Sequence, residues 1–120
     1  MAHLLVVDDD PLFREIAREA LVQAGHDVSL AENGVAATEV SPPPALAVVD
    51  MLMPERDGIE TIRDLRGRWP GVKLVAVSAG SKGFEPSLLL RAAKAMGADV
   101  VLQKPIDHDT LVTVIANLLG

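Results

Sequence analysis

Three short apolar runs that each end in charged residues constrain the fold of this chain most strongly. They are 3–10 (HLLVVDDD), 45–50 (ALAVVD) and 100–105 (VVLQKP). Apolar runs of this length, separated by segments with helical periodicity, are typical of buried parallel strands. In an open parallel sheet, binding sites form beyond the carboxyl ends of the strands. The pattern therefore predicts that several carboxylates and one ammonium group meet at one edge of a sheet.

The composition favours one globular domain and argues against several classes of function. The chain has 120 residues, of which 49% are hydrophobic, and a formal net charge of −6. This acidic charge argues against binding to nucleic acid or to an anionic membrane surface. Aromatic residues make up 2% and cysteine is absent, so neither a base-stacking platform nor thiolate chemistry is expected. The apolar runs are too short to span a bilayer and no signal-peptide pattern is present, so we expect a cytoplasmic domain.

Strands and helices are expected to alternate along the whole chain. Strands are predicted over 3–8, 26–31, 45–50, 74–78 and 100–103, and helices over 11–25, 35–40, 58–69, 86–96 and 108–119. Asp10 and Asp107 are the expected N-caps of the first and last helices. Right-handed crossovers then predict a flavodoxin-like (βα)5 α/β fold, a doubly wound parallel five-stranded sheet in the order 2-1-3-4-5. We expect residues 1–120 to form a single domain with no output domain.

Acidic residues at the ends of two predicted strands suggest a cation site. Asp8 and Asp9 end the first strand and Asp50 ends the third, and these strands are neighbours in the predicted order. Carboxylates packed together oppose folding, and a hard divalent ion such as Mg²⁺ relieves their repulsion. The simpler interpretation, in which the acids are solvated helix caps, suits Asp10 but accounts poorly for two further adjacent acids.

Two other strand ends carry polar side chains that suit a phosphoryl group. Lys104 follows the fifth strand and can neutralise a carboxylate or hold a phosphoryl oxygen. Ser78 ends the fourth strand, and its hydroxyl can donate a hydrogen bond to such an oxygen. Neither residue is diagnostic alone, because a lysine before a turn and a strand-ending serine are both common.

Taken together and in this order, these residues resemble the receiver domain of response regulators in two-component signalling. The resemblance covers essentially the whole chain, and its most specific part is the run 50–58 (DMLMPERDG). The other matching residues are Asp8-Asp9, Ser78-Ala79 and Lys104-Pro105. The resemblance implies the flavodoxin-like fold and a domain that accepts a phosphoryl group.

The resemblance also implies a magnesium site around the phosphoacceptor. Asp50 would be the residue that is phosphorylated and would also contact the ion. Asp9 would bind Mg²⁺ directly and Asp8 partly through water. The backbone carbonyl of Leu52 would be a further ligand.

On the phosphoryl side, the resemblance assigns Ser78 and Ala79 to the phosphoryl oxygens and Lys104 to Asp50 or to the same oxygens. The Lys104-Pro105 peptide bond would be cis. The phosphoryl donor would be a phosphohistidine on a histidine kinase or phosphotransfer protein. The chain would not be an enzyme, apart from autocatalysed transfer to, and hydrolysis from, its own aspartate. The histidines of this chain, which we expect to be structural or exposed, are His3, His26 and His108.

Three features leave the output of such a domain open. Val101 stands where many receivers carry an aromatic residue that turns inward on phosphorylation, and a β-branched side chain is too stiff for that movement. The segment 80–86, with Phe84, is longer than in compact receivers and is either a gap-filling loop or an alternative reporter of phosphorylation. Surplus apolar residues in 88–90 and 111–119 predict a partner surface, or a homodimer, on the face of the fourth helix, fifth strand and fifth helix. Scattered apolar exposures are also normal.

The leading functional interpretation is a phosphoacceptor that changes conformation and binds an unknown downstream protein when phosphorylated. The alternative is a phosphate shuttle or sink in a phosphorelay, which needs the same site but a different phosphoryl lifetime. A magnesium-dependent phosphatase is disfavoured, because Pro11 and Leu12 follow the aspartates where its signature would continue. A scaffold-only receiver is disfavoured by the intact set of strand-end residues.

Overall fold

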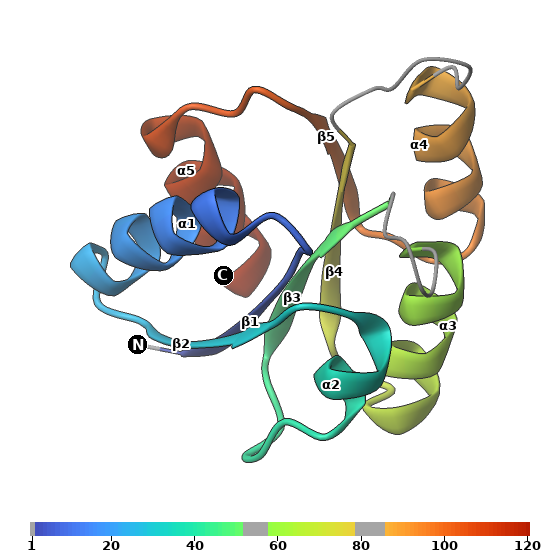
Figure 1. Cartoon of the computed structure of the whole chain (residues 1–120), viewed down its shortest axis with the longest axis horizontal. Helices are drawn as coiled ribbons and strands as arrows, with labels where there is room; N and C mark the ends of the chain where they lie inside the picture. The colour runs from blue at the N-terminus through green and yellow to red at the C-terminus, as the bar shows by residue number, and fades with distance from the viewer. Residues whose placement is uncertain (1, 52–57, 79–85) are drawn as a thin grey trace.

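A five-stranded parallel sheet, with helices on both faces, forms the centre of the molecule (Figure 1). The computed structural model describes residues 2–51, 58–78 and 86–120, and for 86–90 it describes the backbone alone. The strands are β1 (His3–Val7), β2 (Asp27–Ala31), β3 (Leu46–Asp50), β4 (Lys73–Ser78) and β5 (Val100–Gln103). The helices are α1 (Pro11–Gln23), α2 (Gly34–Thr38), α3 (Gly58–Arg68), α4 (Pro86–Ala95) and α5 (His108–Leu119). All strand pairs are parallel, and the order β2-β1-β3-β4-β5 confirms the predicted topology.

The element boundaries differ from the prediction only at their ends. β4 begins one residue early because Lys73, although exposed, pairs with Leu46 of β3. β2 begins one residue late, at Asp27, which pairs with His3 at the start of β1. The short helix α2 begins at Gly34 and ends at Thr38, before the predicted end.

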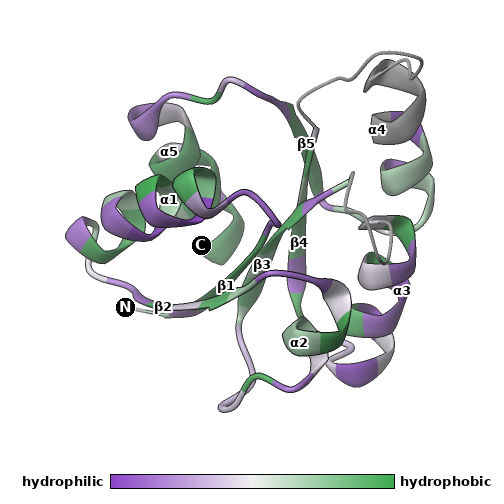
Figure 2. Cartoon of the chain, viewed as in Figure 1, coloured by the Kyte–Doolittle hydropathy of each residue, from purple (hydrophilic) through white to green (hydrophobic). Residues whose placement is uncertain are grey.

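The three central strands, β1, β3 and β4, are buried on both faces, which explains why they are continuous apolar runs. The edge strands β2 and β5 are mostly half-buried. One face packs against α1 and α5 through side chains such as Leu4, Val6 and Val48. The other face packs against α2, α3 and α4 through side chains such as Leu5 and Val49. Figure 2 shows apolar residues on the strands and polar residues on the outer surfaces of the helices. Polar groups on the three central strands can therefore reach solvent only where those strands end.

Helix caps and a turn fix the entry of the chain into its helices. The Asp10 side chain accepts a hydrogen bond from the Leu12 backbone at 3.0 Å, with Pro11 at the first position of α1. Gly25, with φ of 98°, ends the first helical segment, as the sequence predicts. The peptide bond between Lys104 and Pro105 is cis.

Among the described residues, none of the helices is long and apolar enough to cross a membrane.

The cap of α5 makes part of the stability dependent on pH. The hydrogen bond that the Asp107 carboxylate accepts from the Thr110 backbone, at 2.7 Å, holds the pKa of this carboxyl below its usual value of 3.8. A lowered pKa stabilises the fold above the unfolded-state pKa, and this stabilisation is lost as pH falls through the folded-state pKa. Asp107→Asn keeps a capping oxygen without the charge. We therefore expect the wild type to lose stability relative to this variant as pH falls from 6 to about 2.5 in urea unfolding experiments; a difference that does not change with pH would contradict this assignment.

Candidate functional site

Polar side chains gather where three neighbouring strands end. Asp8 directly follows β1, Asp50 is the last residue of β3, and Ser78 is the last residue of β4. These three residues are buried, with exposed fractions of 0%, 6% and 0%. The Asp8 backbone N–H donates to the Ala31 carbonyl at 3.1 Å, which extends the ladder between β1 and β2 by one residue. Because parallel strands end at the same edge, the backbone itself brings these side chains together.

Three carboxylates form an acidic cluster at this edge. Carboxylate oxygens of Asp8, Asp9 and Asp50 all lie within 4.8 Å of one another, and only Asp9 is exposed. β1 and β3 are adjacent strands, so the cluster joins residues that are distant in the sequence. Carboxylate oxygens are the donors that Mg²⁺ prefers, and burial leaves their mutual repulsion poorly screened. The donor set and its burial fit a hard divalent cation.

Lys104 brings positive charge to the same cluster. Its ammonium nitrogen donates to Asp8 Oδ2 at 2.7 Å, and the lysine and aspartate side chains are 15% and 1% exposed. The Lys104 backbone N–H donates to the Ser78 carbonyl at 2.8 Å, continuing the ladder between β4 and β5. This bond fixes the backbone of Lys104 beside Ser78. Ser78, Lys104 and the three acids therefore share one edge of the sheet.

Asp8 is held from several directions, which sequence reasoning did not predict. Its Oδ1 accepts a hydrogen bond from the Asp10 backbone at 2.9 Å, while Oδ2 accepts from Lys104. Its backbone carbonyl accepts a hydrogen bond from Arg14 Nη1 at 2.8 Å. The position of Arg14 in the first turns of α1, directly after the acids, is the one sequence signal for this contact. The orientation of the Asp8 carboxylate is thus fixed by backbone and side-chain donors together.

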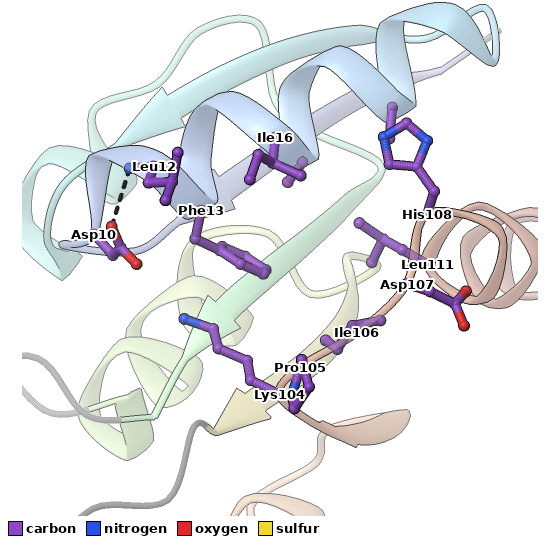
Figure 3. Close-up of a pocket in the computed structure, with 12 residues that line it drawn as sticks. Asp10, Leu12, Phe13, Ile16, Lys104, Pro105, Ile106, Asp107, His108 and Leu111 are labelled. Atoms are coloured by element: carbon purple, nitrogen blue, oxygen red, sulfur yellow. Dashed lines mark hydrogen bonds between the residues drawn. The ribbon is translucent and has the colours of Figure 1, made fainter.

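A cavity of about 410 Å³ adjoins the site between α1 and the segment that leads into α5 (Figure 3). Lys104 is among its lining residues, and its ammonium nitrogen lies 4.0 Å from the centroid of the Phe13 ring. Leu12 and Ile16, which also line the cavity, are 67% and 48% exposed. Sequence reasoning missed both the cavity and the contact between Lys104 and Phe13, because no local sequence pattern links two residues so far apart in the chain.

Some expectations from the sequence fall outside the described residues. These are the Leu52 carbonyl ligand, the contact by Ala79, and the loop with Phe84. The side chains of 88–90 are also outside them. Val101 is half-buried and packs against the core on the side of α3 and α4. The surplus apolar residues of α5 are mostly half-buried, with Leu111 and Ile115 fully buried.

The three histidines lie away from the acidic cluster or on the surface. His3 Nε2 and Ser29 Oγ lie 2.7 Å apart at the start of the sheet. His26 Nδ1 accepts a hydrogen bond from the Ala2 backbone, and His108 is exposed. These placements agree with the structural or exposed roles that the sequence suggests.

The chain is similar to known proteins along nearly its whole length. Residues 4–116 match the family model of the response regulator receiver domain. Response regulator MprA of Mycobacterium tuberculosis is 36% identical over 118 residues, which cover 97% of this chain and 50% of MprA. A cyclic di-GMP phosphodiesterase of Thermotoga maritima is 30% identical over 108 residues, covering 90% of this chain and 28% of that protein. The chain thus spans about half, or less, of the length of these curated relatives.

The fold is likewise that of solved receiver domains. A CheY-like response regulator receiver domain protein from Methanospirillum hungatei superimposes with a TM-score of 0.89 at 22% identity, covering 99% of this chain and 94% of that one. The match to the family model, the strand order and the similarity to MprA agree with one another. This chain therefore belongs to the response regulator receiver domain family.

Proposed function

We propose that this chain takes a phosphoryl group from the phosphohistidine of a partner histidine kinase or phosphotransfer protein onto Asp50, with Mg²⁺ as cofactor. The observation that carries the proposal is the position of the Asp50 carboxylate. It is 6% exposed, lies within 4.8 Å of two further carboxylates, and shares its edge of the sheet with a lysine. A nucleophile, ligands for a cation and a positive charge are together the parts that phosphoryl transfer requires.

The transfer forms one bond and breaks one. A carboxylate oxygen of Asp50 attacks the phosphorus in line, while the bond between phosphorus and the donor imidazole nitrogen breaks. The electron pair of that bond stays on the imidazole nitrogen, which takes up a proton from water. Asp50 then carries an acyl phosphate, and attack by water on this phosphate returns the free carboxylate and inorganic phosphate. The chain acts only on its own aspartate and is not an enzyme for a separate substrate.

The surrounding residues would bind and orient the reacting groups. Asp8 and Asp9, with Asp50 and the Leu52 carbonyl, would hold Mg²⁺, which when bound neutralises charge on the phosphoryl oxygens.

On the phosphoryl side, the Ser78 hydroxyl and the Ala79 backbone would donate hydrogen bonds to the oxygens of the transferred group. The Lys104 ammonium would supply the second positive charge. The Lys104 backbone N–H donates to the Ser78 carbonyl at 2.8 Å, so both residues lie at the edge of the sheet where Asp50 ends β3.

The phosphorylated domain would signal through contacts with other proteins in the cytoplasm. The face of α4, β5 and α5 is the proposed surface for a downstream protein, or for a second copy of this chain, because Lys104 directly follows β5 and Asp107 caps α5. A movement of Lys104 toward a phosphoryl group would therefore first change the conformation of this face.

Acetyl phosphate with Mg²⁺ tests the proposal without knowledge of the partner. We expect intact-mass measurement to show a gain of one phosphoryl group, which EDTA suppresses. Reductive trapping of the acyl phosphate, followed by peptide mapping, should locate the modification at residue 50. A gain that is independent of Mg²⁺, or that maps to another residue, would refute the proposal.

A further inference from the structure

Lys104 is held in place by two groups of different kinds. Its ammonium nitrogen donates to Asp8 Oδ2 at 2.7 Å and lies 4.0 Å from the centroid of the Phe13 ring. Figure 3 shows the lysine side chain extending from the segment after β5 toward α1, with Phe13 beside its nitrogen. This distance is well inside the range of a cation–π interaction. The lysine side chain is only 15% exposed, and such interactions are strongest when the cation is desolvated.

The Phe13 ring is fixed independently of the lysine. Phe13 lies in the first turn of α1, directly after the Asp10 cap and Pro11. It is half-buried and packs against the core between the sheet and the helices α1 and α5. The ring therefore offers a face whose position does not depend on where the ammonium is, whereas the four-carbon stem of Lys104 has many rotamers.

The two partners of Lys104 respond differently to a cation in the acidic cluster. Asp8 Oδ2 belongs to a carboxylate of that cluster, so a divalent cation there would compete for this carboxylate and repel the ammonium. The Phe13 ring carries no net charge and is not a ligand for a hard cation. Its attraction for the ammonium therefore persists when the attraction from Asp8 is weakened.

We propose that Phe13 is a positioning residue for Lys104. When a cation engages Asp8, the face of the Phe13 ring keeps the Lys104 ammonium beside the acidic cluster. The inference rests on the proposed function, because it concerns how Lys104 is presented to a phosphoryl group on Asp50. It gives α1 a role in phosphoryl transfer, that of holding the Lys104 ammonium in place, which the strand-end residues alone do not fill.

Three substitutions separate the ring face from simple packing. Phe13→Leu keeps an apolar side chain but removes the ring, and Phe13→Tyr keeps an aromatic face. Ile16→Ala is the matched control, because Ile16 lines the same cavity from the same helix and is 48% exposed. Thermal unfolding of each variant shows whether α1 remains packed.

The rate of phosphorylation by acetyl phosphate with Mg²⁺ is the first measurement. We expect Phe13→Leu to lower the maximal rate about fivefold, with the half-saturating acetyl phosphate concentration unchanged. Phe13→Tyr should stay within about twofold of the wild type, since its ring binds cations comparably. Ile16→Ala should leave the rate unchanged. Equal losses in the leucine and tyrosine variants would assign the effect to packing, and no loss in the leucine variant would refute the role outright.

Proton NMR of the Lys104 ε-methylene group is the second measurement, and it needs no phosphorylation. A cation above a ring face places these protons in the shielding region of the ring, so we expect an upfield shift in the wild type and in Phe13→Tyr but not in Phe13→Leu. The shift should persist when Mg²⁺ is added; its disappearance would overturn the inference. If the wild type takes up no phosphoryl group, the proposed function fails, while this measurement still decides whether the ring holds Lys104.

Discussion

Asp50→Asn is expected to abolish the magnesium-dependent gain of a phosphoryl group and, without Mg²⁺, to stabilise the fold. An amide oxygen is a far weaker nucleophile than a carboxylate, so no acyl phosphate should form. The same change removes one of three negative charges whose oxygens lie within 4.8 Å of one another. At this separation two unit charges repel by about 3.5 kcal/mol with an effective dielectric constant of 20. Because the Lys104 ammonium and solvent already offset part of this repulsion, we expect a gain of about 1 kcal/mol.

Urea unfolding in EDTA and in excess Mg²⁺ measures the second effect. The wild type should gain more stability from Mg²⁺ than Asp50→Asn does, because the variant lacks one ligand and much of the repulsion that the ion relieves. Asp27→Asn is the matched control, since Asp27 is exposed and begins β2, at the opposite edge of the sheet from the acidic cluster. Destabilisation of Asp50→Asn in EDTA, or continued phosphorylation of the variant, would contradict the proposed site.

Most of the fold could be predicted because the central strands of the sheet are buried on both faces. Runs such as 4–7 and 46–49 are fully buried, so hydrophobic burial alone requires continuous apolar sequence there and leaves little ambiguity about the strands. The helix starts at Asp10 and Asp107 follow from local capping chemistry, which a single sequence contains. The strand ends that were missed, such as Lys73, depend on pairing with a distant strand.

The gathering of the strand-end residues was predictable, whereas their individual contacts were not. Parallel strands end at one edge, so Asp8, Asp50 and Ser78 had to approach one another. Which aspartate is buried, and which carboxylate pairs with Lys104, depends on side-chain packing between residues 96 positions apart. The ring of Phe13 contacts Lys104 only because α1 packs next to the segment after β5, and no local pattern reports that packing.

Gly58 is the position where the smallest substitution is expected to damage both the fold and the site. A Cβ atom there would lie 2.5 Å from the Met51 Cα and 2.6 Å from the Asp50 carbonyl oxygen. Both are backbone atoms at the end of β3, and the Gly58 N–H also donates to the Met51 carbonyl at 3.2 Å. Neither neighbour can turn away as a flexible side chain could. Gly58→Ala must therefore displace the start of α3 or the end of β3.

We expect Gly58→Ala to lower the free energy of unfolding by about 3 kcal/mol, at the upper end of the usual cost of overpacking. Gly67→Ala is the matched control in the same helix: Gly67 is exposed, a Cβ there meets nothing within 4 Å, and alanine should stabilise α3 by about 0.5–1 kcal/mol. Urea unfolding of both variants in EDTA measures the difference, and effects of the same sign would refute the close approach. Because the clash falls on the carbonyl of Asp50, Gly58→Ala protein that still folds should also be phosphorylated more slowly than Gly67→Ala. Gly58 would thus be required because its backbone packs closely against the end of β3, where Asp50, the proposed phosphoacceptor, lies.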